Sequence, residues 1–312
     1  MSSLISVNNL TRRYGDFCAV NNISFELKTG DILGFLGPNG AGKTSTMQML
    51  TGNLAPTLGE ININGVDLLD HPKTAKASIG YLPETPPLYM EMSVTEYLQY
   101  CGRLHLINKS QLSNVCDSAI ERCGLGEVRQ RLIRNLSKGY QQRVGIAQAI
   151  LHSPPVIILD EPTVGLDPIQ ILEIRQLMKT LGENHGIILC THILPEVQAV
   201  CNRVQIINCG ELVYSSDINE LLDSDNKKFE ISITTSTSQD ELASHDVFNS
   251  VEMTSANSFL AESDLSADKL TEYIVKQQWG LTRFATHEAS LEQIFIDLTA
   301  GEKNADTTEN SL

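Results

Sequence analysis

Long apolar runs and cysteine motifs are what this sequence most clearly lacks. No apolar stretch approaches the ~18 residues that a membrane-spanning helix needs, and the first residues, MSSLISVNNLTRRYG, are too polar to predict a signal peptide. The seven cysteines form no C-x-x-C pair and no histidine-rich metal spacing. This pattern argues against a disulfide framework or a zinc site and favours a reducing cytosol. We therefore expect any membrane role to depend on a partner protein.

Basic residues are also scarce, which bears on the class of ligand. The chain has 23 Lys and Arg against 38 Asp and Glu, a net charge of −15. A nucleic-acid partner normally requires a basic face, so we expect none, although bound nucleotides remain possible. The segment after Leu222 carries 17 of the acidic and only 6 of the basic residues. This shift in charge predicts that the last third of the chain is a separate unit.

The length of 312 residues suggests two domains, or one large domain with an appendix. We expect a first domain over residues 1–222, a small acidic α+β domain over 223–300, and a disordered tail over 301–312. DSDNKK, near residues 223–228, has the composition of a linker, preceded by a helix over 217–222. The tail has almost nothing to bury.

The apolar pattern predicts an α/β fold. Three short runs, DILGFLG, PPVIILDEP and GIILCTH, are apolar almost throughout, as strands of a parallel sheet covered on both faces would be. Residues 93–152 show mostly helical periodicity and predict a helical insertion. After Leu222, strand and helix patterns alternate, which is typical of a small α+β unit.

A glycine-rich segment between the first apolar strand and a helix matches the pattern G-x-x-x-x-G-K-[ST]. Its backbone N–H groups can wrap a phosphate at the helix N-terminus, while the lysine neutralises the β- and γ-phosphates and the threonine hydroxyl binds Mg²⁺. A glycine-rich turn with an exposed lysine is the simpler alternative. The predicted phosphate-binding residues are Gly37, Pro38, Asn39, Gly40, Ala41, Gly42, Lys43, Thr44 and Ser45.

Two adjacent carboxylates end the second apolar strand, at the edge where α/β sheets bind ligands. Asp160 suits magnesium coordination, and Glu161 suits polarising a water for in-line attack on a γ-phosphate. An isolated Asp-Glu pair would more often be solvated at a strand end. Combined with the glycine-rich segment, the pair predicts a P-loop nucleotidase.

The stretch Asn135-Leu136-Ser137-Lys138-Gly139-Tyr140-Gln141-Gln142-Arg143 resembles the signature motif of ATP-binding cassette (ABC) proteins. Lys138 and Tyr140 depart from the commonest form of that motif. The resemblance covers about residues 4–222 and implies a P-loop NTPase cassette, with a mixed sheet core and a helical subdomain. It also implies that residues from 137 to 141, namely Ser137, Lys138, Gly139, Tyr140 and Gln141, contact a nucleotide. Ser137 would also suit an ordinary helix N-cap.

Four further positions follow the same resemblance. Tyr14 would stack on adenine, although a lone tyrosine can equally be a packing residue. Glu84 stands where most members have a magnesium-binding glutamine, and this exchange adds a negative charge beside Asp160 and Glu161. Asp167 belongs to a loop that crosses a dimer interface. His192 would contact the γ-phosphate and the attacking water, which makes Glu161 and His192 the expected catalytic residues and Thr44, Glu84 and Asp160 the expected metal ligands.

The resemblance implies an ATPase that uses ATP and Mg²⁺ and no other metal. Because the signature serine of one cassette faces the ATP of another, it also implies a dimer, either homodimeric or with a similar chain. The expected membrane partner is a polytopic permease, which would hold the chain at the cytoplasmic face of the cell membrane. The motifs YLPE, PPLY and LSKGY with the C-terminal unit look like those of bacterial export cassettes.

Two other functions remain open at the level of sequence. A soluble ABC ATPase acting on DNA, ribosomes or iron–sulfur assembly would share the motifs, but the chain has one cassette and an acidic appendix. A small-molecule P-loop kinase would leave LSKGYQQR and His192 unexplained. For transport, a groove near residues 84–100 would receive the permease's coupling helix, although Pro86 to Met92 could equally be core residues of the insertion.

Overall fold

The computed structural model describes residues 3–218, 228–235, 238–255, 257–286 and 291–300. Two compact units divide the chain: one comprises residues 1–216 with 298–312, and the other comprises Asp217–Asp297. The tail over 301–312, residues 219–222 of the expected helix and residues 223–227 of the expected linker lie outside the described residues. Two residues at the ends of these predictions are in strands instead: Asp217 ends one strand and Lys228 begins another. Within the described part, no helix is both long and apolar enough to cross a bilayer.

A six-stranded sheet forms the centre of the first unit, in the order β10-β9-β3-β8-β7-β6. The pairs β3·β8, β3·β9, β7·β8 and β6·β7 are parallel. Every residue of β3, β7 and β8 is buried, which confirms the prediction of a parallel sheet covered on both faces. These strands are β3 (Ile32–Leu36), β6 (Ile79–Leu82), β7 (Val156–Asp160), β8 (Gly186–Thr191), β9 (Arg203–Asn208) and β10 (Glu211–Asp217).

The register of the parallel strands fixes their carboxyl ends at one edge. Leu36, the last residue of β3, pairs with Thr191 of β8, and Asp160 of β7 pairs with Cys190. The segments that follow these three strands therefore start side by side. This edge lies where the sequence places its phosphate-binding loop and paired carboxylates.

A second sheet, in the order β2-β1-β4-β5, packs over the first and is antiparallel. Its alternating side chains share one core with β3, β7 and α1, where Phe25 and Phe35 lie with ring centroids 5.8 Å apart. The elements are β1 (Ser3–Tyr14), β2 (Phe17–Lys28), α1 (Lys43–Leu50), β4 (Leu58–Ile63), β5 (Val66–Asp67) and α2 (Pro72–Lys76).

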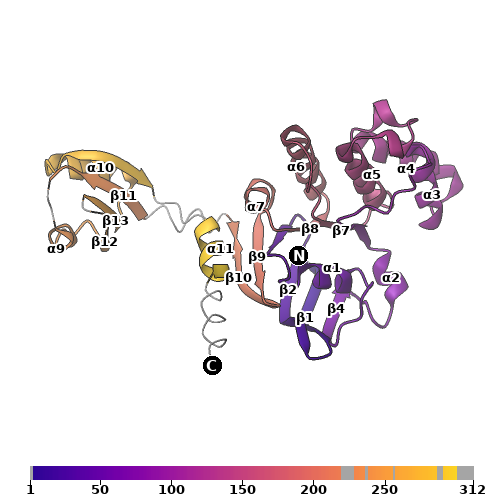
Figure 1. Ribbon diagram of the computed structural model, residues 1–312, viewed down its shortest axis with the longest axis horizontal. Helices are drawn as coiled ribbons and strands as arrows, with labels where there is room; N and C mark the ends of the chain where they lie inside the picture. The colour runs from indigo at the N-terminus through magenta and orange to yellow at the C-terminus, as the bar shows by residue number, and fades with distance from the viewer. Residues whose placement is uncertain (1–2, 219–227, 236–237, 256, 287–290, 301–312) are drawn as a thin grey trace, which may run out of the picture. The chain divides into compact units, whose positions relative to one another are not determined.

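The helical insertion lies where the sequence predicts it and gathers on the β6–β7 side of the sheet (Figure 1). Ser93 begins it with a capping box, because its hydroxyl accepts from the Glu96 N–H and the Glu96 carboxylate accepts from the Ser93 N–H. A Cβ on Gly80 would meet the Ala149 carbonyl at 2.1 Å, so glycine lets β6 and α5 touch. The helices are α3 (Val94–Leu104), α4 (Lys109–Arg122) and α5 (Lys138–Ile150), with 3-10 turns Gly126–Val128 and Ile133–Asn135.

Two helices flank β8 in the chain, and both matter for the site. The helix α6 (Pro168–Gly182) precedes β8, and Asp167 caps it by accepting from the Gln170 N–H at 2.9 Å. The short helix α7 (Leu194–Val200) was not expected from the sequence. It begins two residues after His192 and carries an acidic residue, Glu196, in its first turn.

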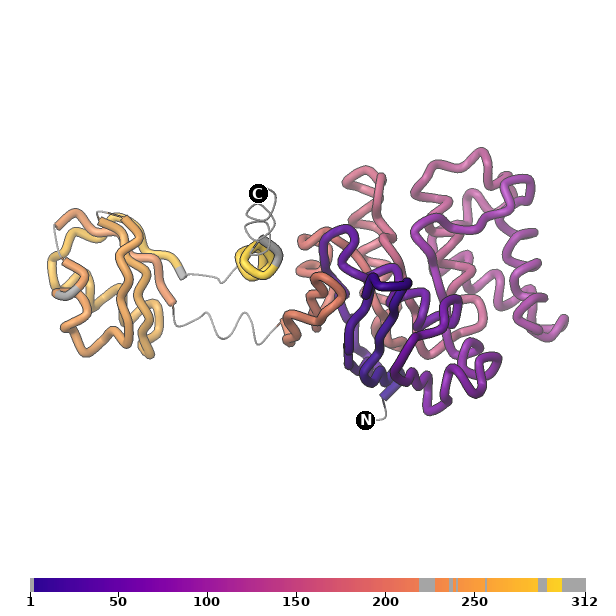
Figure 2. The backbone as a smooth tube through the Cα atoms, turned by 60° about the horizontal axis from the view of Figure 1, so that its bottom comes forward, coloured from indigo at the N-terminus to yellow at the C-terminus, as the bar shows by residue number. Residues whose placement is uncertain are grey.

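The second unit is a four-stranded antiparallel sheet in the order β12-β13-β11-β14, traced in orange and yellow in Figure 2. Its core, including Phe229, Phe259 and Trp279, joins one face of the sheet to α10. The elements are β11 (Lys228–Ile233), α9 (Gln239–Ala243), β12 (Ser250–Ser255), β13 (Ser258–Glu262), α10 (Ala267–Lys276) and β14 (Leu281–Thr286). The last helix, α11 (Leu291–Ala300), ends in the first unit, where the Leu298 carbonyl accepts from Asn208 Nδ2 at 3.1 Å.

Candidate functional site

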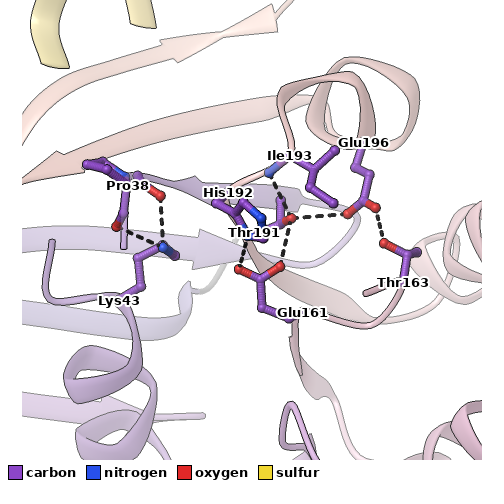
Figure 3. Close-up of polar contacts among 9 residues, drawn as sticks. Pro38, Lys43, Glu161, Thr163, Thr191, His192, Ile193 and Glu196 are labelled. Carbon is purple, nitrogen blue, oxygen red and sulfur yellow. Dashed lines mark hydrogen bonds and ion pairs between the residues drawn. The ribbon is translucent and has the colours of Figure 1, made fainter. Parts of the chain in front are cut away.

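The loop between β3 and α1 has the geometry of an anion-binding loop. Gly42 has φ +106°, and a Cβ there would meet the Ala19 carbonyl at 2.5 Å, so only glycine fits. Lys43 is buried, and its Nζ donates to the carbonyls of Gly37 at 2.8 Å and Pro38 at 3.0 Å (Figure 3). The ammonium is thus held at the mouth of the loop, beside the N-terminus of α1. A phosphate placed there would meet both a positive charge and free backbone N–H groups.

Paired carboxylates face this loop from the end of β7. Asp160 and Glu161 are 3% and 9% exposed. Glu161 stands just past the strand with φ +48°, an uncommon backbone conformation for a side chain of this size, and its N–H donates to the Cys190 carbonyl at 2.8 Å. Burial raises the pKa of Asp160, and the neighbouring charges of Glu161 and Glu84 raise it further, while the Cys190 thiol and Lys43 act in the opposite sense. A cation at this point would offset that crowding of negative charge.

His192 follows β8 and turns its ring toward Glu161. Its Nδ1 lies 2.7 Å from Glu161 Oε1, while Glu161 Oε2 accepts from the Thr191 hydroxyl at 3.2 Å (Figure 3). Both carboxylate oxygens of Glu161 are therefore engaged by neighbouring residues of one strand end. The His192 side chain is 42% exposed and can still meet a ligand.

A cavity of about 400 Å³ connects these groups. It brings together eleven of the residues predicted from the sequence, and the backbone of Gly37, Pro38 and Ala41 completes the loop beside it. Phe17 and Ala19 also line it and were missed, because each is a single apolar residue outside any motif. Val164, which lines it too, belongs to the same predicted interface loop as Asp167 but was not predicted to meet the nucleotide. The predicted residues in the lining are Tyr14, Asn39, Gly40, Gly42, Lys43, Thr44, Ser45, Glu84, Asp160, Glu161 and His192.

The predicted signature residues lie elsewhere. Ser137 caps α5, accepting from the Tyr140 N–H at 3.4 Å, as the alternative reading of that residue expected. The amine of Lys138 lies against Gly165, where a Cβ would be only 2.4 Å from Nζ. Among the described residues that line the cavity there is none from 137 to 141, nor Asp167. One chain therefore does not bring its signature to its own phosphate loop.

The residues that line the cavity match the three parts of a magnesium-bound nucleotide. They include aromatic side chains, a phosphate-binding loop and a group of carboxylates. Tyr14 lines the cavity and is 44% exposed, so its ring is accessible to a base, and the guanidinium of Arg12 lies 4.5 Å from its ring centroid. The Thr44 hydroxyl and the carboxylates of Asp160 and Glu84 line the same cavity. Oxygen donors of this kind suit Mg²⁺ rather than a transition metal.

Comparisons with known proteins identify the family of the chain. Residues 20–164 match the family model described as ABC transporter. The chain is 34% identical over 305 residues to the bacitracin transport ATP-binding protein BcrA of Bacillus licheniformis, covering 96% of this chain and 99% of that protein. It is 38% identical over 218 residues to the uncharacterized ABC transporter ATP-binding protein YxlF of Bacillus subtilis, covering 70% and 72%.

A solved structure shows the same fold. The structure of cbiO1 from Clostridium perfringens, part of the ABC transporter complex cbiONQ, superposes with a TM-score of 0.65 at 28% identity, covering 72% of this chain and 92% of that one. The residues that line the cavity, the cassette fold and these relatives lead to one conclusion. The chain belongs to the ABC transporter ATP-binding proteins, and it is an ATP-binding subunit of that family.

Proposed function

We propose that this chain hydrolyses MgATP between two cassettes and thereby drives a membrane permease, in the direction of export. The observation that carries the hydrolytic part is the pair of Glu161 and His192, joined at 2.7 Å at the strand ends that face Lys43. Glu161 would accept a proton from the attacking water, and His192 would hold Glu161 and contact the γ-phosphate. Mg²⁺, held by Thr44, Glu84 and Asp160, would supply charge neutralisation for the phosphates.

The position of the signature supports a dimer. Ser137 and Gly139 lie outside the cavity of their own chain, so a second cassette is needed to bring such residues to the nucleotide. In the dimer, a γ-phosphate contacted by both cassettes favours the closed state, and hydrolysis removes that contact. Binding of ATP would then close the pair, and hydrolysis would let it open.

A groove of about 1010 Å³ supports a permease partner over a soluble role. It lies between the core and α3, and its wall includes Tyr89, whose ring centroid is 5.3 Å from that of Tyr100. His105 and His152 stack at 4.0 Å on the same wall, and burial lowers the pKa of His152 to about 4, so this histidine is neutral at pH 7. The described lining is largely aromatic and apolar, with one lysine, Lys76, whose Nζ donates to the Gly52 carbonyl at 2.8 Å. A groove of this kind suits a short, mostly apolar helix.

The groove corresponds only in part to the sequence expectation. Pro87, Leu88 and Tyr89 line it, whereas Pro86, Met90 and Met92 are not among its lining residues. We propose it as the seat of the permease's coupling helix. The relation to BcrA along nearly the whole chain supports coupling to transport, because that protein is named for bacitracin transport. The direction of export rests on the resemblance of the YLPE, PPLY and LSKGY motifs to those of bacterial export cassettes.

The hydrolytic role is tested with Glu161→Gln. This substitution keeps the size of the side chain and removes the base, so we expect ATP to bind normally while kcat falls roughly a hundredfold or more. The variant should also accumulate as an ATP-bound dimer, seen by size-exclusion chromatography. Turnover at the wild-type rate would reject Glu161 as the base.

The permease role is tested by co-purification from membranes with a matched pair of variants. Leu104 lies in the groove and is 64% exposed, whereas Leu58, equally exposed at 65%, lies on β4 outside it. We expect Leu104→Glu to lose a co-purifying polytopic protein and Leu58→Glu to retain it. Recovery of the wild-type chain with only cytosolic proteins would favour the soluble ABC ATPase.

A further inference from the structure

A second acidic residue lies buried behind the proposed base. Glu196, in the first turn of α7, has no exposed surface. Its Oε1 accepts a short hydrogen bond from the Thr163 hydroxyl, and its Oε2 lies 3.1 Å from the Thr191 hydroxyl (Figure 3). Glu196 lies outside the nucleotide cavity, so its contacts need another explanation.

Thr191 stands between the two carboxylates. Its Oγ1 lies 3.2 Å from Glu161 Oε2 and 3.1 Å from Glu196 Oε2, and it accepts from the Ile193 N–H at 3.1 Å. A hydroxyl has a single proton to donate. If both carboxylates were ionised, Thr191 could satisfy one of them only, and the other contact would join two acceptors at hydrogen-bond distance.

A proton on Glu196 makes every contact consistent. Glu196 then donates to Thr191, Thr191 donates to Glu161, and Thr163 donates to the remaining oxygen of Glu196. The surroundings support this arrangement. Burial, the largest influence, raises the pKa of Glu196 to about 7, and the charge of Glu161 also raises it, while the Thr191 hydrogen bond, Arg175 of α6 and His192 lower it.

We propose that Glu196 is a positioning residue for the reaction: as a neutral acid it directs the Thr191 hydroxyl onto Glu161 Oε2. Because His192 contacts Oε1, both carboxylate oxygens of Glu161 then have a hydrogen-bond partner. These two contacts would orient the carboxylate toward the attacking water. Such orientation of a base matters because a small misplacement slows proton transfer. This inference rests on the proposed role of Glu161 as the base.

The decisive experiment measures steady-state ATP hydrolysis by the full chain and its variants. Glu196→Gln keeps a donor for Thr191 and an acceptor for Thr163, so we expect turnover within about twofold of wild type. Glu196→Leu removes both, and we expect kcat to fall about tenfold with KM unchanged, the effect of losing one hydrogen bond to a charged group. An equal loss in Glu196→Gln and Glu196→Leu would overturn the proposal.

Substitutions of Thr191 provide a second test, which leaves the buried Glu196 side chain unchanged. Thr191→Val keeps the shape of the side chain and removes the hydroxyl, so we expect the same fall in kcat at unchanged KM, and Thr191→Ser should restore turnover. Thr11→Val is the matched control, because Thr11 is also buried but lies on β1 of the antiparallel sheet. Normal turnover in Thr191→Val, or an effect confined to KM, contradicts the proposal.

A double variant separates this inference from the function on which it rests. If Thr191 acts through Glu161, then adding Thr191→Val to Glu161→Gln should slow single-turnover hydrolysis no further. A further tenfold loss in the double variant would show that Thr191 acts by another route. Full activity of Glu161→Gln alone would instead reject the proposed base, whatever the Thr191 variants do.

Discussion

The two units of this chain use a sheet in opposite ways. In the cassette, the strands β3, β7 and β8 are buried on both faces, so polar groups are confined to the edge where the strands end. In the C-terminal unit, β11 alternates between buried and partly exposed residues, because only one face of its sheet packs on a core. The sheet of the cassette therefore gathers polar side chains along one edge, whereas the sheet of the C-terminal unit distributes them over one face.

Buried polar residues make the difference visible. The cassette buries Lys43, Asp160, Glu161 and Glu196. Among the described residues of the C-terminal unit, Ser263 is the buried polar residue, and its hydroxyl donates to the Val247 carbonyl at 2.5 Å. Because burying a charge is costly, a fold keeps such residues where they serve a ligand or a reaction. We therefore place the proposed catalysis in the cassette and expect that the two units can be perturbed separately.

The largest expected effect breaks the C-terminal unit alone. Phe259 is 1% exposed in its core, and Phe259→Ala should destabilise that unit by about 3–5 kcal/mol. Thermal unfolding followed by calorimetry should show an earlier transition for this unit while nucleotide affinity is unchanged. Met253→Ala, at a position 42% exposed on the same sheet, is the control. A loss of ATP affinity in Phe259→Ala would show that the units are energetically coupled.

The next expected effect is on how the free energy of unfolding of the cassette depends on pH. The pKa of Glu196 is about 7 in the folded chain, against 4.5 for an ordinary glutamate. Between these values the folded chain keeps a proton that the unfolded chain loses, so stability falls as pH rises and then levels above pH 7. Glu196→Gln removes this dependence and should gain up to about 3 kcal/mol relative to wild type between pH 4.5 and 7.

Urea unfolding at pH 5 and pH 8 measures that difference directly. Glu60→Gln, at an exposed position of the same unit, is the matched control. A variant Glu196→Gln with the same pH dependence as wild type would mean that Glu196 is ionised in the folded chain throughout this range.

The third expected effect is on nucleotide binding, which we place in the cassette and not in the C-terminal unit. Lys43 is the buried cation of the cavity, and Lys43→Ala should lower ATP affinity roughly a hundredfold because it removes a charge beside the phosphates. Titration with a fluorescent nucleotide measures it. Lys179→Ala, on the exposed face of α6, is the matched control, and similar affinities in the two variants would reject the phosphate contact.

The smallest expected effect lies at the aromatic end of the cavity. Tyr14 has Arg12 on one ring face, and Tyr14→Ala should weaken ATP binding about fivefold by removing the stacking surface for adenine. Tyr14→Phe should keep the affinity. Unchanged binding of ATP by Tyr14→Ala would leave Tyr14 as a packing residue.

The sequence allowed the fold and most of the cavity to be predicted, because glycine loops and paired carboxylates at strand ends have local signals. The phosphate loop, Asp160, Glu161 and His192 all follow apolar runs of the kind that parallel strands require. Glu196 had no such signal. It lies on α7, a helix of seven residues that is too short for periodicity to reveal, and its partners Thr163 and Thr191 are 33 and 5 positions away.

The full set of residues that line the groove could not be predicted from the sequence either. Pro87 to Tyr89 were recognised as apolar surface, but His105 and His152, 47 positions apart by their numbers, meet only in the fold. Contacts of this kind depend on how α3 and α5 pack, which a pattern in one segment does not contain. Alternation in the C-terminal unit predicted its strands well, because one buried face gives a clear period of two.

The pairing of Leu36 with Thr191, and of Asp160 with Cys190, means that the site is assembled by backbone hydrogen bonds before any nucleotide arrives. The entropy of bringing Lys43, Glu161 and His192 together is lost during folding, so little of the binding free energy of ATP is needed for it. Because the site depends on this register, a change in the length of one strand would disrupt it. Deleting one residue from β8 would shift Thr191 by about 3.3 Å and turn it to the opposite face of the sheet.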